Sequence, residues 1–307
     1  MPNAQNNRAP RLVAALPGNR MSGFTIVASQ EKAGIRHRPN PIPMQTNSFH
    51  YSEQDGIARV RFARPDTLNS LTFKVYRDLT DLMYALRTND AVRAVLIEGN
   101  GRGFCSGGDV HEIIGELMKR DVKGLLDFTR MTGELITNMR LLEKPIVSAI
   151  NGIAAGAGAV IALASDFRIF AKEAKIAFLF QKVGLTAADM GAVFLLPKVV
   201  GLARATEMLM LGDSITSEEA YRIGLANKVV ELAELESTAL ALSERLASSA
   251  TMALGLTKRL INNEWNMDLT SAIEQEATAQ ALMLQSYDHK EFHASFVEKR
   301  KPKFEGR

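Results

Sequence analysis

Two glycine-rich turns constrain this chain more than any other feature, because each leads from an apolar stretch into a helical pattern. The first contains Gly107-Gly108-Asp109 and the second contains Gly156-Ala157-Gly158. Small residues where a helix begins leave backbone N–H groups unpaired at the positive end of the helix dipole. Two such turns that face each other supply a pair of amide donors for an oxygen that becomes negative during a reaction. Together they predict an enzyme site that stabilises an enolate-type oxygen.

Other glycine motifs give less support to rival functions. Neither turn matches the GxGxxG pattern of a dinucleotide-binding unit or the GxxxxGK[ST] pattern of a phosphate-binding loop. The chain also has no GxSxG motif, which counts against an α/β-hydrolase. The paired turns therefore remain the strongest chemical signal in the sequence.

Composition places the chain among globular proteins. Hydrophobic residues make up 46% of its 307 residues and charged residues 23%, as in ordinary folded domains. No segment has the ~18–20 uncharged apolar residues that a membrane span requires, so we expect no membrane-spanning segment. The single cysteine, Cys105, can form neither an intramolecular disulfide nor a Cys-rich zinc site, which fits a reducing, cytoplasmic compartment.

Basic charge is concentrated near the beginning of the chain. Residues 1–45 contain six Lys or Arg and one Glu, so the rest is slightly acidic although the formal net charge is +3. The body of the chain therefore lacks the broad basic character that favours nucleic-acid binding. We expect residues 1–45 to form a basic, flexible extension; a targeting segment and an early start codon, with Met21 or Met44 as later starts, are the alternatives.

Hydrophobic periodicity divides the remaining chain into an α/β part and a helical part. Residues 49–53 and 57–62 predict a β-hairpin, and residues 71–86 predict a helix capped by Ser70 or Thr72. Further strands are expected at 92–97, 145–150 and 167–170, with helices starting near Val110 and covering 122–142. After about residue 190 helices are expected at 203–224, 232–248, 251–264 and 268–296, with only 227–231 strand-like.

Several ordered motifs resemble the crotonase (enoyl-CoA hydratase/isomerase) superfamily. The segment FCSGGD at 104–109 resembles the first family motif, and KPIVSAINGIAAGAG at 144–158 resembles the second. Shorter similarities follow in order at 68–71, 211–213, 220–226 and 294–302, so the resemblance runs from about residue 48 to the C-terminus. It implies an α/β fold: a crotonase-like spiral of ββα units over 46–230 and a helical C-terminal oligomerisation region over 231–307. Such chains form homotrimers or hexamers made of two trimers.

The resemblance also implies an acyl-CoA thioester substrate, with coenzyme A as part of that substrate and no other cofactor or metal. By this resemblance, the backbone N–H groups of Gly108 and Ala157 would bind the thioester oxygen. Five residues would line the path of the adenine and pantetheine groups: Thr67, Leu68, Ser106, Gly107 and Asp109. Phe296 and Lys299 match tail residues that reach the coenzyme A of a neighbouring subunit.

The chain departs from the family at both hydratase glutamates. Val160 occupies the first position and Lys182 the second, and hydration needs a base for the water and an acid for the α-carbon. Hydratase is still the label that similarity favours, while enoyl- or dienoyl-CoA isomerase, acyl-CoA decarboxylase and thioester hydrolase remain alternatives. A coenzyme A- or RNA-binding protein without catalysis is the non-enzyme alternative, and its only electrostatic support is the basic extension.

Asp189 is the candidate proton carrier, because its Ala187-Ala188-Asp189 context resembles dienoyl-CoA isomerases. Burial among apolar neighbours would raise its pKa and suit proton transfer, while a helix N-cap before Met190 is the alternative role. His111, after the first glycine turn, is a weaker catalytic candidate. His289 and His293 lack the HExxH pattern and predict a surface helix instead of a metal site.

Overall fold

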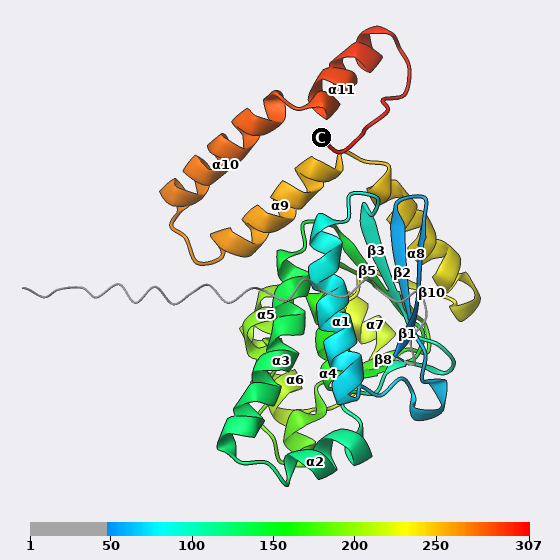
Figure 1. Cartoon of the computed structure of the whole chain (residues 1–307), viewed down its shortest axis with the longest axis vertical. Coiled ribbons are helices and arrows are strands. Elements are labelled where there is room, and N and C mark those ends of the chain that lie inside the picture. The colour runs from blue at the N-terminus through cyan, green and yellow to red at the C-terminus, as the bar shows by residue number, and fades with distance from the viewer. Residues whose placement is uncertain (1–47) are drawn as a thin grey trace, which may run out of the picture. The chain divides into compact units, whose positions relative to one another are not determined.

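The computed structural model describes residues 48–307, which lie in one compact unit. Six strands form the larger sheet, in the order β1-β2-β3-β5-β7-β10 (Figure 1). Their bounds are β1 Phe49–Gln54, β2 Ile57–Phe62, β3 Ala94–Glu98, β5 Ile146–Ile150, β7 Phe167–Ala171 and β10 Lys228–Val230. Only β1 and β2 pair antiparallel, as the predicted hairpin, and the other neighbours are parallel.

A second sheet of four short strands carries the functional loops. Its order is β4-β6-β8-β9, with bounds β4 Gly103–Cys105, β6 Ile153–Ala155, β8 Lys175–Ala177 and β9 Ile215–Thr216. The pairs β4–β6 and β6–β8 are parallel, and β9 runs antiparallel to β8. Hydrophobic periodicity predicts none of these four strands, because segments of two or three residues are too short to show alternation.

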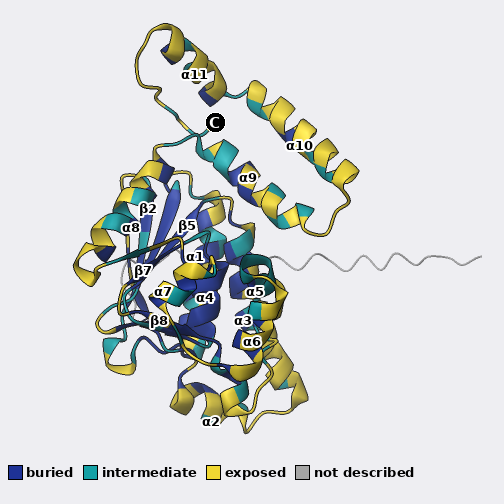
Figure 2. Ribbon diagram, turned by 180° about the vertical axis from the view of Figure 1, so that it is seen from behind, coloured by how far each residue is buried: buried dark blue, intermediate teal, exposed yellow. Residues whose placement is uncertain are grey.

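Helices cover the sheets and fill the space between them. Helix α1 (Phe73–Ala85) packs on α3 (Val122–Leu141), and α3 contacts α4 (Ala157–Ala164). Every residue of α4 is buried, so this helix is part of the core, as its dark blue ribbon in Figure 2 shows. Helix α8 (Leu232–Ala247) packs on β3, β5 and β7. The hydroxyl oxygen of Thr72 accepts a hydrogen bond from the Val75 N–H, which confirms one of the two expected caps of α1.

The C-terminal helices form an arm that is largely exposed in this chain. Its members are α9 (Thr251–Glu264), α10 (Leu269–Leu284) and α11 (Tyr287–Val297). Helix α9 contacts α3, and α10 packs on α9 and α11 (Figures 1 and 2). The chain therefore has the expected α/β architecture followed by C-terminal helices, although the proposed boundary between residues 230 and 231 stays a prediction.

Three predicted helices differ from the structure. The segment 203–224 is broken into α6 (Leu202–Leu211) and α7 (Ser217–Arg222), because the αL residue Gly212 ends α6 and β9 follows. The segment 268–296 is broken at Ser286, whose hydroxyl caps α11 by accepting from the His289 N–H. The helix expected near Val110 is a short π-helical turn over Val110–Ile114, followed by α2 (Gly115–Leu117).

Residues 1–45, expected to form a basic extension, lie outside the described residues. Among residues 48–307, no helix combines the length and apolar character needed to cross a membrane.

Candidate active site

The three parallel strands of the smaller sheet bring the candidate residues to one edge. The first glycine turn follows β4, the second follows β6, and the loop that carries Asp189 follows β8. Because the carboxyl ends of parallel strands meet at the same edge of a sheet, the segments that directly follow the three strands are neighbours, and Asp189 comes after the 3-10 helix Leu179–Val183. A hydrogen bond from the Gly156 N–H to the Ala177 carbonyl oxygen, 2.9 Å, joins the second and third of them.

The two glycine turns lie in van der Waals contact. A methyl group built on Gly107 would lie 3.0 Å from the Ala155 carbonyl oxygen and 3.6 Å from the Ala157 nitrogen. The φ angle of Gly107 is +99°, which a residue with a side chain rarely adopts. Glycine at this position therefore provides both the turn and the close approach of the two backbones.

The two candidate amides have no hydrogen-bond partner among residues 48–307. Around Gly108, the Leu71 N–H donates to the Gly107 carbonyl and the Asp109 N–H donates to the Leu71 carbonyl, each at 2.8 or 2.9 Å, which leaves the Gly108 N–H free. Ala157 is the first residue of α4, so its N–H has no acceptor within the helix. The positive end of the α4 dipole adds to the attraction for an anion near these amides.

Helix α4 approaches β4 closely because Gly158 has no side chain. A methyl group built on Gly158 would lie 2.2 Å from the Cys105 carbonyl oxygen, which is far too close for any contact. Cys105 itself is fully buried, and burial raises the pKa of its thiol to about 12. The thiol is therefore protonated near neutral pH and is a poor nucleophile.

Three of the expected coenzyme A residues are tied together beside the first turn. The Ser106 N–H donates to the Leu68 carbonyl at 2.9 Å, and the Ser106 hydroxyl donates to the Thr67 carbonyl at 3.0 Å. Leu68 and Asn69 both have positive φ angles, and the Asn69 side chain donates to the Gly103 carbonyl at 2.9 Å. The segment 64–70 is thus fixed against β4, and its binding role stays a prediction.

Asp109 is buried and uses both carboxylate oxygens within the protein. Its Oδ1 accepts from the backbone N–H groups of His111 and Glu112, and its Oδ2 accepts from Ser70 and Arg64. The Glu112 N–H first, and then the Ser70 hydroxyl, the His111 N–H and the charge of Arg64, hold the pKa of this carboxyl below its usual value. The His111 side chain is exposed on the helical turn that Asp109 caps.

Asp189 is not a helix cap, which corrects one of its two expected roles. Helix α5 (Ala192–Val200) begins three residues later, after Met190 and Gly191 with φ of 49° and 81°. Burial raises the pKa of the Asp189 carboxyl, although the Met190 N–H acts in the opposite direction. Since no hydrogen bond from a side chain of residues 48–307 reaches this carboxylate, it is available for proton transfer.

Tyr76 is a site residue that the sequence analysis missed. It lies on α1 with 3% of its surface exposed, and its hydroxyl oxygen is 3.9 Å from a methyl group built on Gly108. Burial raises the pKa of the phenol well above its usual value, and the charges of Cys105 and Asp189 raise it further. The phenol is therefore neutral and can donate a hydrogen bond near the first glycine turn.

The two hydratase positions carry no acid. Val160 is completely buried within α4, and Lys182 is half-exposed and forms an ion pair of 2.7 Å with Asp213. Val160 has no proton to give, and the ammonium of Lys182 is directed to a surface carboxylate. Asp189 is therefore the remaining acid–base candidate, and its charge acts on Tyr76, whose hydroxyl lies near the first turn.

The expected tail residues lie away from this site in a single chain. Phe296 is 73% exposed at the end of α11, and Lys299 follows it with a φ angle of 54°. Helix α11 lies far from α2, which follows the first glycine turn, in both views (Figures 1 and 2). Contact of Phe296 and Lys299 with a neighbouring subunit's substrate stays a prediction.

Comparison with known proteins gives the family of the chain. The family model described as enoyl-CoA hydratase/isomerase matches residues 52–307. The chain belongs to this family. The family assigned from the glycine motifs is thereby confirmed, and so is the crotonase-like fold, because solved enoyl-CoA hydratase structures superimpose on the chain.

Relatives within the enoyl-CoA hydratase/isomerase family have different activities. A 1,2-epoxyphenylacetyl-CoA isomerase of Escherichia coli is 34% identical over 83% of this chain and 97% of its own length. A short-chain-enoyl-CoA hydratase of Clostridium acetobutylicum is 30% identical over 84% of this chain and 97% of its own. A Streptomyces coelicolor structure classed with the enoyl-CoA hydratases is 48% identical, with a TM-score of 0.85 over 87% of this chain and 97% of that one. The chain is therefore an acyl-CoA enzyme of the hydratase/isomerase type.

Proposed function

We propose that this enzyme is an isomerase that moves a carbon–carbon double bond in an enoyl-CoA thioester. The observation that carries the proposal is Asp189, a carboxyl group with a raised pKa and no side-chain hydrogen bond among residues 48–307, in a chain whose two hydratase positions hold Val160 and Lys182. One carboxylate can remove a proton and return it elsewhere, whereas hydration needs separate groups for the water and the carbon. The 1,2-epoxyphenylacetyl-CoA isomerase at 34% identity gives an example of a relative named as an isomerase of an acyl-CoA thioester.

The proposed reaction conserves atoms and electrons without a cofactor. The Asp189 carboxylate takes a proton from C2 of a 3-enoyl-CoA, and the C–H electrons form a dienolate. The N–H groups of Gly108 and Ala157 donate to the thioester oxygen while it carries the negative charge. Protonated Asp189 then returns the proton to C4, which yields the 2-enoyl-CoA. Coenzyme A takes part only as the carrier of the acyl group.

A direct assay separates isomerase from hydratase. The purified enzyme is given a 3-enoyl-CoA, and conjugation of the product is followed by ultraviolet absorbance; crotonyl-CoA is the substrate for hydration. We expect isomerisation that Asp189→Asn lowers by about 10²–10⁴-fold, the usual contribution of a general base. Rapid hydration of crotonyl-CoA with no isomerisation would overturn the proposal.

The amide pair is tested by removing one N–H. Proline is tolerated at the first position of a helix, where the N–H has no partner, so Ala157→Pro deletes the donor from α4 at small cost to the fold. We expect kcat to fall by about 10²–10³-fold, as for loss of an oxyanion donor elsewhere. Ala157→Gly keeps the N–H and is the matched control. Equal activity of the proline and glycine variants would exclude this role for Ala157.

Two further predictions concern the location and the assembly of the protein. A cytoplasmic location still rests on the lone Cys105, and assembly into trimers or hexamers still rests on the family resemblance.

A further inference from the structure

A group of charged side chains surrounds a cavity of about 400 Å³ on a different part of the molecule. The cavity is bordered by the end of α4, by β7, and by one side each of α5 and α9. Four cationic side chains line it, those of Arg140, Arg168, Lys198 and Lys258, and Asp166 is the carboxylate among them. None of these residues takes part in the proposed reaction.

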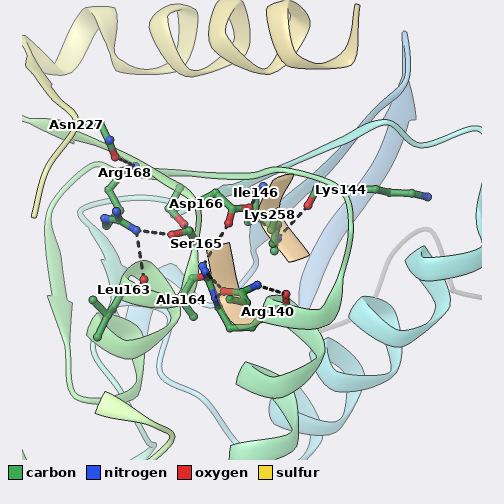
Figure 3. A network of polar contacts seen from close by, with 12 residues as sticks. Arg140, Lys144, Ile146, Leu163, Ala164, Ser165, Asp166, Arg168, Asn227 and Lys258 are labelled. Atoms are coloured by element: carbon green, nitrogen blue, oxygen red, sulfur yellow. Dashed lines mark hydrogen bonds and ion pairs between the residues drawn. The ribbon is translucent and has the colours of Figure 1, made fainter. Parts of the chain in front are cut away.

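Asp166 forms ion pairs with two of the four cations. Its Oδ1 lies 3.2 Å from Arg140 Nη1, and its Oδ2 lies 2.7 Å from Lys258 Nζ (Figure 3). Oδ2 also accepts a hydrogen bond of 2.8 Å from the Ile146 N–H. Arg168 and Lys198 have no salt bridge with any carboxylate of residues 48–307, so the cavity keeps an excess of positive charge.

Carbonyl groups at the C-terminal end of α4 compensate part of the excess positive charge in the cavity. Arg140 donates to the Ala164 carbonyl at 3.1 Å, and Arg168 Nη1 donates to the Leu163 carbonyl at 3.2 Å and to the Ser165 carbonyl (Figure 3). These carbonyls lie at the negative end of the helix dipole, which favours cations. The Nη2 of Arg168 has no hydrogen bond to residues 48–307, so one donor of this buried guanidinium is unused.

Lys198 has no anionic partner among residues 48–307. Its Nζ is buried and has no hydrogen-bond partner in the described part of the chain, and it lies 3.3 Å from the ring centre of Phe194 and 5.0 Å from that of Trp265. Desolvation lowers the pKa of this lysine, and the charge of Arg140 lowers it further. An ammonium between two rings, beside other cations, is therefore short of an anion.

We propose that this cavity binds a small organic carboxylate, whose head accepts hydrogen bonds from Lys198 and Arg168. The volume lies within the ~300–1,000 Å³ of small-molecule pockets. Leu163, Leu254 and Ile261 give apolar walls on which a short hydrocarbon body packs. The carboxylate supplies an anion to Arg168 and Lys198, which have no salt bridge within residues 48–307, whereas Arg140 and Lys258 already pair with Asp166.

Trp265 makes the proposal directly measurable, because it is the only tryptophan of the chain and it lines the cavity. Tryptophan fluorescence of the full-length enzyme is followed while hexanoate is added at constant ionic strength. We expect a saturable change with hexanoate. Hexan-1-ol, which has the same hydrocarbon body without the charge, produces no such change at the same concentrations.

Substitution of Lys198 tests where the probe binds. Lys198→Met weakens hexanoate binding by about tenfold or more, since loss of a charge-assisted hydrogen bond of ~1.4 kcal/mol changes affinity tenfold. Lys175→Gln, an exposed lysine on β8, leaves binding unchanged. Both variants keep the wild-type acyl-CoA activity, which shows that they are folded.

Three results would overturn the carboxylate site. The first is a hexanoate response that is absent, or equally strong in the Lys198→Met protein. The second is an equal response to hexan-1-ol, which would mean that the cavity selects only apolar bodies. The third is a Trp265 fluorescence that changes with protein concentration and does not respond to hexanoate. This would mean that a second copy of the chain fills the cavity.

Discussion

The environment of Asp189 disfavours the charged form of its carboxyl group. Burial raises its pKa, so the native protein binds this proton more tightly than the unfolded chain does. The stability that Asp189 contributes is therefore present below its unfolded pKa and is lost as the pH rises through the raised native value. At neutral pH the charged side chain destabilises the fold, as expected of a group kept for chemistry.

Replacement of Asp189 should lower the activity and raise the stability of the protein. Asp189→Asn removes the proton carrier and the buried charge together, so we expect isomerase activity to be lost while the free energy of unfolding at pH 7 increases. The gain should become smaller in acid, as wild-type Asp189 becomes protonated below its raised native pKa. Urea unfolding at pH 7 and pH 4 measures it, with the surface variant Asp213→Asn as control. A variant that is inactive and less stable at both pH values would indicate a structural role.

Asp189 is also expected to determine how the isomerase activity falls at low pH. Since only the carboxylate accepts a proton from C2, isomerase activity should fall as the pH drops through a value above the ordinary aspartate pKa. The pH dependence of kcat/KM measures this inflection in the wild-type enzyme. An acid limb at the ordinary aspartate value would contradict the burial of this group.

Tyr76 is predicted to position the substrate or Asp189 through its hydroxyl. Tyr76→Phe keeps the ring, which packs edge-on against Phe128 at 6.0 Å between centroids, and removes only the donor. We expect a fall of about tenfold in kcat/KM with unchanged thermal stability, the loss of one hydrogen bond of ~1–1.5 kcal/mol. Tyr84→Phe, on the same helix, is the control. Unchanged kinetics for Tyr76→Phe would assign the phenol to the core alone.

Sequence patterns could single out the candidate main-chain donors but not Tyr76. Gly108 and Ala157 stand in glycine-rich motifs, and such motifs identify backbone positions where small residues are needed. Tyr76 lies among the apolar residues that give α1 its buried face, so periodicity treats it as core. Asp189 was recognised as a candidate, yet its cap role was wrong because Met190 and Gly191 both adopt positive φ and delay α5.

Long elements were predictable and short ones were not. The hairpin of β1 and β2 and the helix α3 follow from alternation and from a helical repeat over many residues. The strands β4, β6 and β8 have three residues each and no recognisable period, although they set the positions of all three site loops. The architecture of the site therefore depends on the elements with the weakest local signal.

The contact between α4 and β4 predicts opposite effects for two glycine substitutions. Gly158→Ala forces a methyl group against the Cys105 carbonyl oxygen, so we expect a loss of about 1–3 kcal/mol in stability and lower activity, since both turns shift. Gly133→Ala, in α3, meets no atom within 4 Å and should stabilise the protein by about 0.5–1 kcal/mol. Denaturant unfolding of both variants measures the difference, and a neutral Gly158→Ala would contradict the close packing.

On the scale of the whole molecule, the C-terminal arm exposes several large apolar side chains, which is typical of interaction surfaces when they are contiguous. Leu269 is 75% exposed and Ile273 is more than half exposed on α10, and Ile273 also borders a cavity of about 770 Å³ between α9, α10 and α11. Exposed apolar residues of this kind mark surfaces that are covered in an assembly. We therefore expect the 33.6 kDa chain to associate, with the trimer as the unit that the family resemblance implies.

Charging this face should dissociate the assembly and reveal whether Phe296 and Lys299 serve a neighbouring site. The double variant Leu269→Lys with Ile273→Lys places two like charges on the apolar face of α10, whereas Thr270→Lys with Thr278→Lys adds the same charge at exposed polar positions. Light scattering should give a lower mass for the first variant alone. If the tail of one subunit binds the coenzyme A of another, the dissociated enzyme should show a higher KM for the acyl-CoA, and Phe296→Ala should raise KM in the intact assembly. A dissociated enzyme with wild-type KM would show that each chain binds its substrate without help from its neighbour.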